Sequence, residues 1–216
     1  MEDLTVIMLT PNLVPKQWAE FHKKMLLEAI GDTSLITISR EPLNWGKNIL
    51  QTGYSTSNVY WQILRGAKLA TTPFVTIAED DTLYPKEHFE HRPPMDKIAY
   101  DLNRWVIFTW GDPFYFHKPT GANSGMIAPR ELLIKALEEK FARYPNGIPE
   151  GLVKEVGSHN DGYVQETFYC SLPYVGFNHD FSVDDLERRH HKKAWPVRAF
   201  DIPKWGRADE LRKHFI

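Results

Sequence analysis

The sequence lacks several features that would mark a secreted, membrane or nucleic-acid-coating protein. Among its 216 residues Cys170 is the only cysteine, which excludes a disulfide framework and predicts a reducing compartment. No run of about 18 apolar residues occurs, so no membrane-spanning helix is expected. The opening MEDLTVIMLTPN carries two acids and only a short apolar run, which is not typical of a signal peptide. We therefore expect a cytoplasmic protein.

Charge of one sign is also missing. Lysine and arginine total 26 against 28 for aspartate and glutamate, so the net charge of −2 excludes attraction of the whole molecule to nucleic acid or membrane. What the chain has instead is an ordinary globular composition, 42% hydrophobic and 25% charged, with aromatic residues at 13%. Its length predicts a single domain over residues 1–216. The seven tryptophans favour a binding groove lined by flat side chains.

The first half of the chain alternates between two patterns. Apolar, β-branched runs predict strands at 4–10, 34–40 and 73–81, and helical spacing of apolar residues predicts helices at 16–30 and 57–70. A loop is expected between Glu41 and Ser57. This alternation predicts an α/β fold, with a mostly parallel central sheet flanked by helices.

The second half is less regular. One or two strands are expected within 98–110 and another at FYFHK, followed by an amphipathic helix at 131–144 and a further helix at 161–169. Charge becomes dense near residue 182. We expect two halves, over 1–100 and 101–181, followed by a basic C-terminal extension over 182–216.

Three consecutive acids, Glu79, Asp80 and Asp81, end the third predicted strand. Ligands of open α/β sheets bind outside the carboxyl ends of the strands. Carboxylate oxygens there suit Mg²⁺ or Mn²⁺, which would neutralise a diphosphate. A solvated acidic turn is the alternative interpretation of the same three residues.

Three segments together resemble the nucleotide-sugar glycosyltransferases of the GT-A fold, especially the family-2-like enzymes. They are the N-terminal strand, the helix NVYWQILRGAKLATT leading into PFVTIAEDD, and GANSGMIAPRELL; the resemblance spans roughly residues 4–170. It implies that 1–100 is a nucleotide-binding half and 101–181 an acceptor-side half. It also implies an inverting, metal-dependent transfer of sugar from a nucleotide-sugar donor, most commonly a UDP-sugar, to an acceptor hydroxyl. The acceptor is left open between a saccharide, a lipid, a protein and a hydroxymethylated DNA base.

The resemblance also implies roles for the donor side. Asp81 would bind the metal, Asp80 would contact the ribose or the metal, and Glu79 would occupy the outer acidic position, where the family has Asp. The remaining donor-side residues are expected near the base, the phosphates or the loop that closes over the nucleotide: Thr10, Pro11, Asn12, Arg40, Lys47 and Asn48.

On the acceptor side, the resemblance places the Gly121–Gly125 loop, with Asn123, Ser124 and Gly125, beside the acceptor, and its glycines would accept positive φ or a close ligand. Trp110 and Asp112 lie just upstream, where the tryptophan could stack on a sugar. An inverting transfer needs a carboxylate to take the acceptor proton. Asp161 is the candidate base and Glu166 the reserve, although an aspartate there also fits a helix cap.

Histidines and cations gather near the C-terminus. Some GT-A enzymes complete the metal site with a histidine, so His190 or His191 is a candidate ligand, and His179 is an alternative. Five cations and no acid lie between Arg188 and Arg198. They suit a leaving diphosphate, or they indicate a non-catalytic nucleic-acid-binding module in which Trp195 and Trp205 stack on bases. A sugar-1-phosphate nucleotidyltransferase is disfavoured because TPNLVPKQW, after the first strand, contains no glycine.

Overall fold

The molecule is built on two larger β-sheets, between which the chain passes several times, and a third, two-stranded sheet near the C-terminus. The structure, a computed structural model, describes residues 1–53, 56–149, 152, 154–158, 161–180 and 197–216. Its elements, in chain order, are β1 Leu4–Thr10, α1 Lys16–Ile30, β2 Ser34–Ser39, β3 Lys47–Leu50, α2 Thr56–Leu69, β4 Phe74–Glu79, β5 Thr82–Leu83, η1 Lys86–Glu90, β6 Lys97–Asp101, β7 Arg104–Phe108, β8 Tyr115–His117, η2 Asn123–Gly125, β9 Met126–Pro129, α3 Arg130–Arg143, β10 Val164–Phe168, β11 Tyr174–Asn178, β12 Arg198–Ala199, β13 Asp201–Ile202, β14 Gly206–Arg207 and α5 Ala208–Arg212.

The larger sheet has seven strands in the order β10-β6-β9-β4-β1-β2-β3. β4, β1, β2 and β3 pair in parallel, β10 pairs in parallel with β6, and β9 runs antiparallel to both of its neighbours. The predicted mostly parallel sheet is confirmed. Because β1, β2 and β4 are adjacent and parallel, their carboxyl ends meet at one edge, which is where the predicted donor residues lie.

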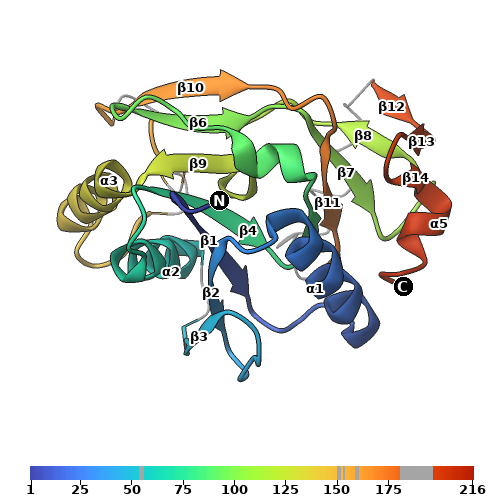
Figure 1. Ribbon diagram of the computed structural model, residues 1–216, viewed down its shortest axis with the longest axis horizontal. Helices are drawn as coiled ribbons and strands as arrows, with labels where there is room; N and C mark the ends of the chain where they lie inside the picture. The colour runs from blue at the N-terminus through green and yellow to red at the C-terminus, as the bar shows by residue number, and fades with distance from the viewer. Residues whose placement is uncertain (54–55, 150–151, 153, 159–160, 181–196) are drawn as a thin grey trace.

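Helices cover both faces of this sheet. α2 and α3 lie side by side on one face, and α1 and η1 lie on the other (Figure 1). Side chains alternate along a strand, so β1 contributes Ile7 and Leu9 to the core under α2 and α3, and Val6 and Met8 to the core under α1. Burial on both faces explains why β1 is apolar along most of its length, as strands of a covered parallel sheet are.

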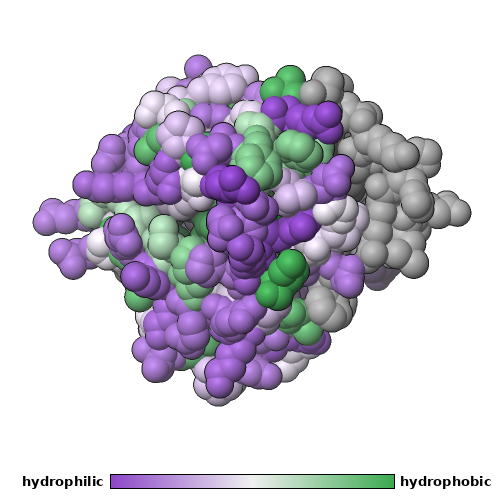
Figure 2. Space-filling model, turned by 90° about the vertical axis from the view of Figure 1, so that its right-hand side faces the viewer, coloured by the Kyte–Doolittle hydropathy of each residue, from purple (hydrophilic) through white to green (hydrophobic). Residues whose placement is uncertain are grey.

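The smaller sheet has five strands in the order β12-β8-β7-β11-β5 and packs against α1 and the C-terminal segment (Figure 1). Trp205 is 7% exposed and its indole N–H donates to the carbonyl of Pro173 at 2.8 Å, so it is a core residue and is wrong as a base-stacking candidate. Phe215 is buried in the same cluster. Where its residues are described, the face of the molecule on the side of the small sheet is mainly hydrophilic, with small separate hydrophobic patches (Figure 2).

Two sequence-based expectations about secondary structure are wrong. The segment expected to form a helix at 161–169 instead forms strand β10, whose Val164–Phe168 pair with Lys97–Asp101 of β6. Gly162, with φ of 89°, turns the chain into that strand, and Val164 and Thr167 are β-branched. The expected loop at 41–57 contains the short edge strand β3. Among the described residues, no helix has the length and apolar character needed to cross a membrane.

Candidate active site

The three acids form a turn at the carboxyl end of β4. Hydrogen bonds to the backbone of this turn come from β1, α1 and β11. The N–H of Asp80 donates to the carbonyl of Leu9 on β1 at 3.2 Å. The indole of Trp18 on α1 donates to the carbonyl of Asp80 at 2.7 Å, and the N–H of Phe177 on β11 donates to the carbonyl of Asp81 at 2.8 Å. The turn therefore lies where the large sheet, α1 and the small sheet meet.

The carboxyl groups of this turn have unusual pKa values because they are crowded and shielded from water. Burial, reinforced by the charge of Asp81, raises the pKa of Glu79 to about 7 and the pKa of Asp80 to about 8. The Thr10 hydroxyl donates to Asp80 and opposes that shift. Arg104 is the cation whose charge lowers the pKa of Glu79, and it does not offset the rise. Ionising either carboxyl group therefore costs free energy in the metal-free fold.

A histidine completes the cluster. His179, directly after β11, lies with Nε2 3.5 Å from Oδ2 of Asp81, and 8% of His179 is exposed. The structure thus brings together with Asp81 the histidine that the sequence ranked as an alternative. His190 and His191 lie outside the described residues. His22 on α1 also lies close by, but burial lowers its pKa to about 4 against the opposing charge of Asp81, so its imidazole is neutral at neutral pH.

These residues fit a divalent cation. Neighbouring ligands of an octahedral ion at about 2.1 Å lie roughly 3 Å apart, which the Asp81–His179 pair approaches. The raised pKa values of Glu79 and Asp80 show that ionising these carboxyl groups is costly in the metal-free fold, and a bound cation would offset that cost. A set of carboxylate oxygens with one imidazole nitrogen suits Mn²⁺ better than Mg²⁺.

On the predicted donor side, Asn12 joins the ends of β1 and β2. Asn12 has a left-handed φ of 57°, and its side-chain oxygen accepts the N–H groups of Arg40 at 2.9 Å and Glu41 at 3.0 Å. Its own N–H donates to the Thr10 hydroxyl at 2.9 Å. Thr10, Pro11, Asn12 and Arg40 are therefore assembled at one edge next to Asp80, as the sequence predicted.

Asn48 has a different environment from the one expected. Its amide nitrogen donates to the hydroxyls of Thr37 at 2.9 Å and Ser39 at 2.8 Å, and its oxygen accepts the N–H of Leu43 at 3.1 Å. These bonds fasten β3 and the preceding loop to β2. The side chain thus has a structural explanation, and its predicted donor contact remains a prediction.

The predicted acceptor loop also reaches the acidic turn. Ser124 is buried and hydrogen-bonds to the Glu79 carboxylate, and Asn123 hydrogen-bonds to the Tyr60 hydroxyl. Gly125 does not have the positive φ that was expected. It is required for packing instead, because a Cβ there would lie 2.9 Å from Cζ of Tyr174. The loop therefore connects the end of β4 to the small sheet.

Trp110 and Asp112 lie in the loop between β7 and β8. The N–H of Thr109 donates to the carbonyl of Asn178 at 3.0 Å, so this loop begins beside the residue that precedes His179. Trp110 is partly exposed and makes an edge contact with Phe108, their ring centroids 5.2 Å apart. The loop that holds Trp110 and Asp112 thus extends from the small sheet close to His179, on the predicted acceptor side.

The two predicted base candidates have other partners. Asp161 precedes a strand rather than a helix, so the helix-cap alternative is wrong. Its carboxylate accepts the N–H groups of Gly157 at 2.8 Å and Tyr163 at 3.1 Å, and it lines a cavity of about 70 Å³ beside α3. Glu166 lies on β10 and contacts His91 at 3.0 Å. Two strands separate β10 from β4, which places them about 14 Å apart.

Sequence reasoning missed a third carboxylate, Glu155, whose charge acts on the acidic turn. The charge of Glu155 raises the pKa of Glu79, Tyr60 and Tyr174, so Glu155 lies within electrostatic range of the acidic turn. It is partly buried and lies six residues before Asp161. Its position in an irregular loop gave no periodic signal that would have singled it out.

Comparisons with solved structures place this arrangement within one fold. The chain is similar to an inositol-1-phosphate CTP transferase from T. maritima, with a TM-score of 0.51 and 7% identity over 89% of this chain and 96% of that one. It is also similar to a glycosyltransferase involved in glycosylation of the major capsid of PBCV-1, with a TM-score of 0.48 and 12% identity over 88% and 98% of the two chains.

A third similar structure, the bifunctional IspDF from Campylobacter jejuni, has a TM-score of 0.46 and 11% identity over 79% of this chain; the chain spans 50% of its length. No protein-family model and no curated protein matches the sequence. At these identities the likeness to the T. maritima transferase concerns the fold alone. The chain has the α/β fold of the nucleotide-diphospho-sugar transferases, as the sequence predicted.

Proposed function

We propose that the protein is a metal-dependent glycosyltransferase that uses a nucleotide-sugar donor. One observation carries the proposal: a crowded, shielded carboxylate turn lies beside His179, at the edge where β1, β2 and β4 end. Clusters of like charge are costly in a folded chain unless a ligand neutralises them. A nucleoside diphosphate with a divalent cation is the ligand class that suits both the excess charge and the position.

Each residue then has a defined task. Asp81 and His179 would hold Mn²⁺ or Mg²⁺, with Asp80 as a further ligand or ribose contact and Glu79 outside it. A cation bound there would neutralise the diphosphate of the leaving nucleotide. Asn12 holds the ends of β1 and β2 together and so shapes the surface on which the base would lie.

For removal of the acceptor proton we favour Glu155 over Asp161. The charge of Glu155 acts on the Glu79 carboxyl group, whereas both oxygens of Asp161 accept backbone N–H groups in their own turn. A general base must have an oxygen available for the incoming hydroxyl. We expect Glu155→Gln to lower kcat by at least about 100-fold, and Asp161→Asn to act mainly on stability.

Binding of UDP in the presence and absence of Mn²⁺, measured by calorimetry, tests the donor site. We expect binding that requires Mn²⁺ and that weakens at least about 100-fold in Asp81→Asn, because losing a direct ligand exceeds the loss of an outer-shell partner. Asp32→Asn, a change of the same kind at an exposed position, is the matched control. Equal binding by both variants would refute the assignment of Asp81.

A nucleotidyltransferase is the second candidate, favoured by the similarity to the T. maritima CTP transferase fold. The segment after β1, TPNLVPKQW, contains no glycine and a single lysine with which to hold a triphosphate. The reaction products separate the two activities. A glycosyltransferase releases a nucleoside diphosphate from a nucleotide-sugar, and a nucleotidyltransferase releases pyrophosphate from a nucleoside triphosphate.

The acceptor follows from a second assay. A saccharide and a hydroxymethylated DNA base are the acceptor classes to compare, with plain DNA as control. The cations at Arg188, Arg189, Lys192 and Lys193, as well as Trp195, lie outside the described residues. Tight binding to plain DNA without any response to UDP and Mn²⁺ would favour the non-catalytic nucleic-acid-binding alternative.

A further inference from the structure

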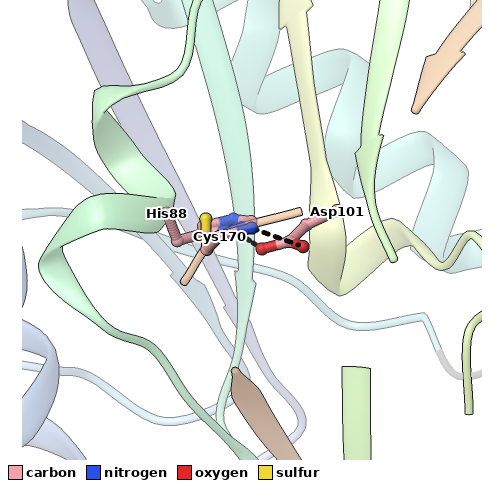
Figure 3. A group of neighbouring side chains, drawn as sticks. All are labelled: His88, Asp101 and Cys170. Carbon is pink, nitrogen blue, oxygen red and sulfur yellow. Dashed lines mark hydrogen bonds and ion pairs between the residues drawn. The ribbon is translucent and has the colours of Figure 1, made fainter. Parts of the chain in front are cut away.

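A second group of ligand-type side chains shares no residue with the acidic turn. His88 lies in η1, Asp101 ends β6 and Cys170 follows β10, and the three side chains point toward one another (Figure 3). One ligand atom from each lies within 4.8 Å of the other two. All three residues are buried, with His88 and Asp101 completely so.

Hydrogen bonding alone leaves this cluster incomplete. His88 Nδ1 lies 3.1 Å from Oδ2 of Asp101, and the other oxygen of Asp101 accepts the N–H of Asn103 at 2.9 Å. His88 Nε2 is buried and has no hydrogen-bond partner among the described residues. Unpartnered buried polar atoms are uncommon in folded proteins and call for an explanation such as a missing ion.

The chemistry of Cys170 is that of a ligand rather than a nucleophile. Burial, with the adjacent charge of Asp101, raises the pKa of this thiol well above its usual range. Catalytic thiols lie in accessible, electropositive surroundings, and Cys170 has neither property. A thiol in this position loses its proton readily only when a metal ion takes the proton's place.

We propose that His88, Asp101 and Cys170 form a structural zinc site. A thiolate, a carboxylate and a neutral imidazole cancel the two positive charges of zinc, so the loaded site carries no net charge into the protein interior. Tetrahedral zinc places such ligand atoms about 3.3–3.6 Å apart, which these side chains reach with shifts of about 1 Å. Mixed nitrogen, sulfur and oxygen donors favour zinc over magnesium or calcium.

The position of the cluster indicates a structural role for a bound metal ion. The chain passes from the large sheet to the small one three times, after β4, after β6 and after β10, and Asp101 and Cys170 lie on the last two of these crossovers. Asn103 donates to the carbonyl of Cys170 at 2.8 Å, and Glu87 of η1 accepts the hydroxyl of Ser171 at 2.6 Å. A zinc ion would link both crossovers and η1, and would fix how the two sheets meet.

Cobalt titration of the full-length, metal-free protein tests the proposal. Co²⁺ bound by a thiolate shows charge-transfer absorption in the near ultraviolet, and Cys170 is the only cysteine in the chain. We expect this band to appear with one equivalent of Co²⁺ and to disappear when Zn²⁺ displaces the cobalt. Zn²⁺ is expected to raise the Tm of the wild-type protein more than that of Cys170→Ser, which keeps only the acidic turn as a metal site.

Variants separate this site from the acidic turn. Asp81→Asn and His179→Ala are expected to keep the charge-transfer band, and Asp101→Asn is expected to weaken cobalt binding at least about 10-fold. Folded wild-type protein that binds Co²⁺ without the band would overturn the proposal, because that metal would then lie elsewhere. This outcome is read on the wild-type protein, so it does not depend on any variant folding.

Discussion

Two aspartate–histidine pairs occupy contrasting surroundings in this protein. Asp81 and His179 lie 3.5 Å apart at the edge of the large sheet, next to two further carboxylates. Asp101 and His88 lie 3.1 Å apart and are sealed from solvent. Burial and the charge of Asp81 raise the pKa of Asp80 beside the first pair. At the second pair burial also raises the pKa of Asp101, but the hydrogen bond and charge of His88 and the bonds from Asn103 and Cys170 together lower it below its usual value.

The contrast shows that an aspartate and a histidine can serve either to bind a catalytic cation or to stabilise the fold. At the edge, burial makes the ionised carboxylates costly, and a bound cation would offset that cost. In the interior, the Asp101 carboxylate has an imidazole and an N–H group as partners, whereas His88 Nε2 has no partner among the described residues. Carboxyl groups with raised pKa values therefore mark the proposed catalytic site, and an unpartnered buried imidazole nitrogen marks the proposed structural one.

The largest expected effect tests whether the inner pair supports the fold. His88→Leu leaves Asp101 buried without its imidazole, so we expect the free energy of unfolding to fall by about 3–5 kcal/mol. Urea denaturation in the presence of a chelator measures it. Asp81→Asn, which removes one of several like charges at the outer pair, is expected to leave that free energy unchanged or higher. Equal losses in both variants would contradict the comparison.

The second expectation concerns pH. The folded-state pKa of Asp80 is about 8 and the usual value is 3.8, so the folded state holds a proton that the unfolded state releases. Stability of the metal-free protein should therefore fall as pH rises between about 4 and 8. Asp80→Asn should remove much of this fall and raise the free energy of unfolding at pH 8 by about 2 kcal/mol.

Saturating Mn²⁺ should suppress the same pH dependence, because a bound cation favours the ionised carboxylates. Thermal unfolding across this pH range, with and without Mn²⁺, provides the measurement. A profile that is flat without metal would show that the acidic turn is hydrated and carries no excess charge.

A smaller effect is expected at Thr10. Thr10→Val removes the hydroxyl that donates to Asp80 and accepts the N–H of Asn12, and should cost about 1 kcal/mol in unfolding free energy. It should also move the pH midpoint of stability upward, since Asp80 loses a bond to its ionised form. Thr5→Val, on the same strand, removes a hydroxyl bonded to Thr72 and should leave that midpoint unchanged.

The smallest effect is expected at Glu166. Its contact with His91 is about a quarter exposed on both sides, so Glu166→Gln should change the free energy of unfolding by less than about 1 kcal/mol. Turnover should also stay within about twofold of the wild-type value, because β10 lies about 14 Å from β4. A large loss of kcat in this variant would restore Glu166 as a catalytic candidate.

The sequence predicted the first half of the fold well because its signals are local. The bounds of α1 and β1 follow from apolar spacing and from Pro11 and Gly31, and the acids after β4 stand out without knowledge of any neighbour. β10 was missed because it is an edge strand with mostly exposed side chains, which leaves little apolar alternation to read.

The candidate site could be predicted only in part, for a related reason. Asp81 and His179 are 98 residues apart, and only the pairing of β5 with β11 brings them together. The contact of His88 with Asp101 and Cys170 likewise depends on two crossovers between sheets. Glu155 acts from an irregular loop. Such contacts depend on which strands pair with one another. No local pattern in a single sequence shows that pairing.

Gly125 gives this topology an unexpected sensitivity. A side chain there would meet Cζ of Tyr174 at 2.9 Å and the carbonyl of Asp101 at 3.2 Å, while the neighbouring Ser124 bonds to Glu79. An added methyl group would therefore collide with Tyr174 and with the backbone of Asp101, which belongs to the inner pair. Because Ser124 is the next residue along the chain, a shift of the backbone at Gly125 would also reach the acidic turn, so one small residue connects the two places compared above.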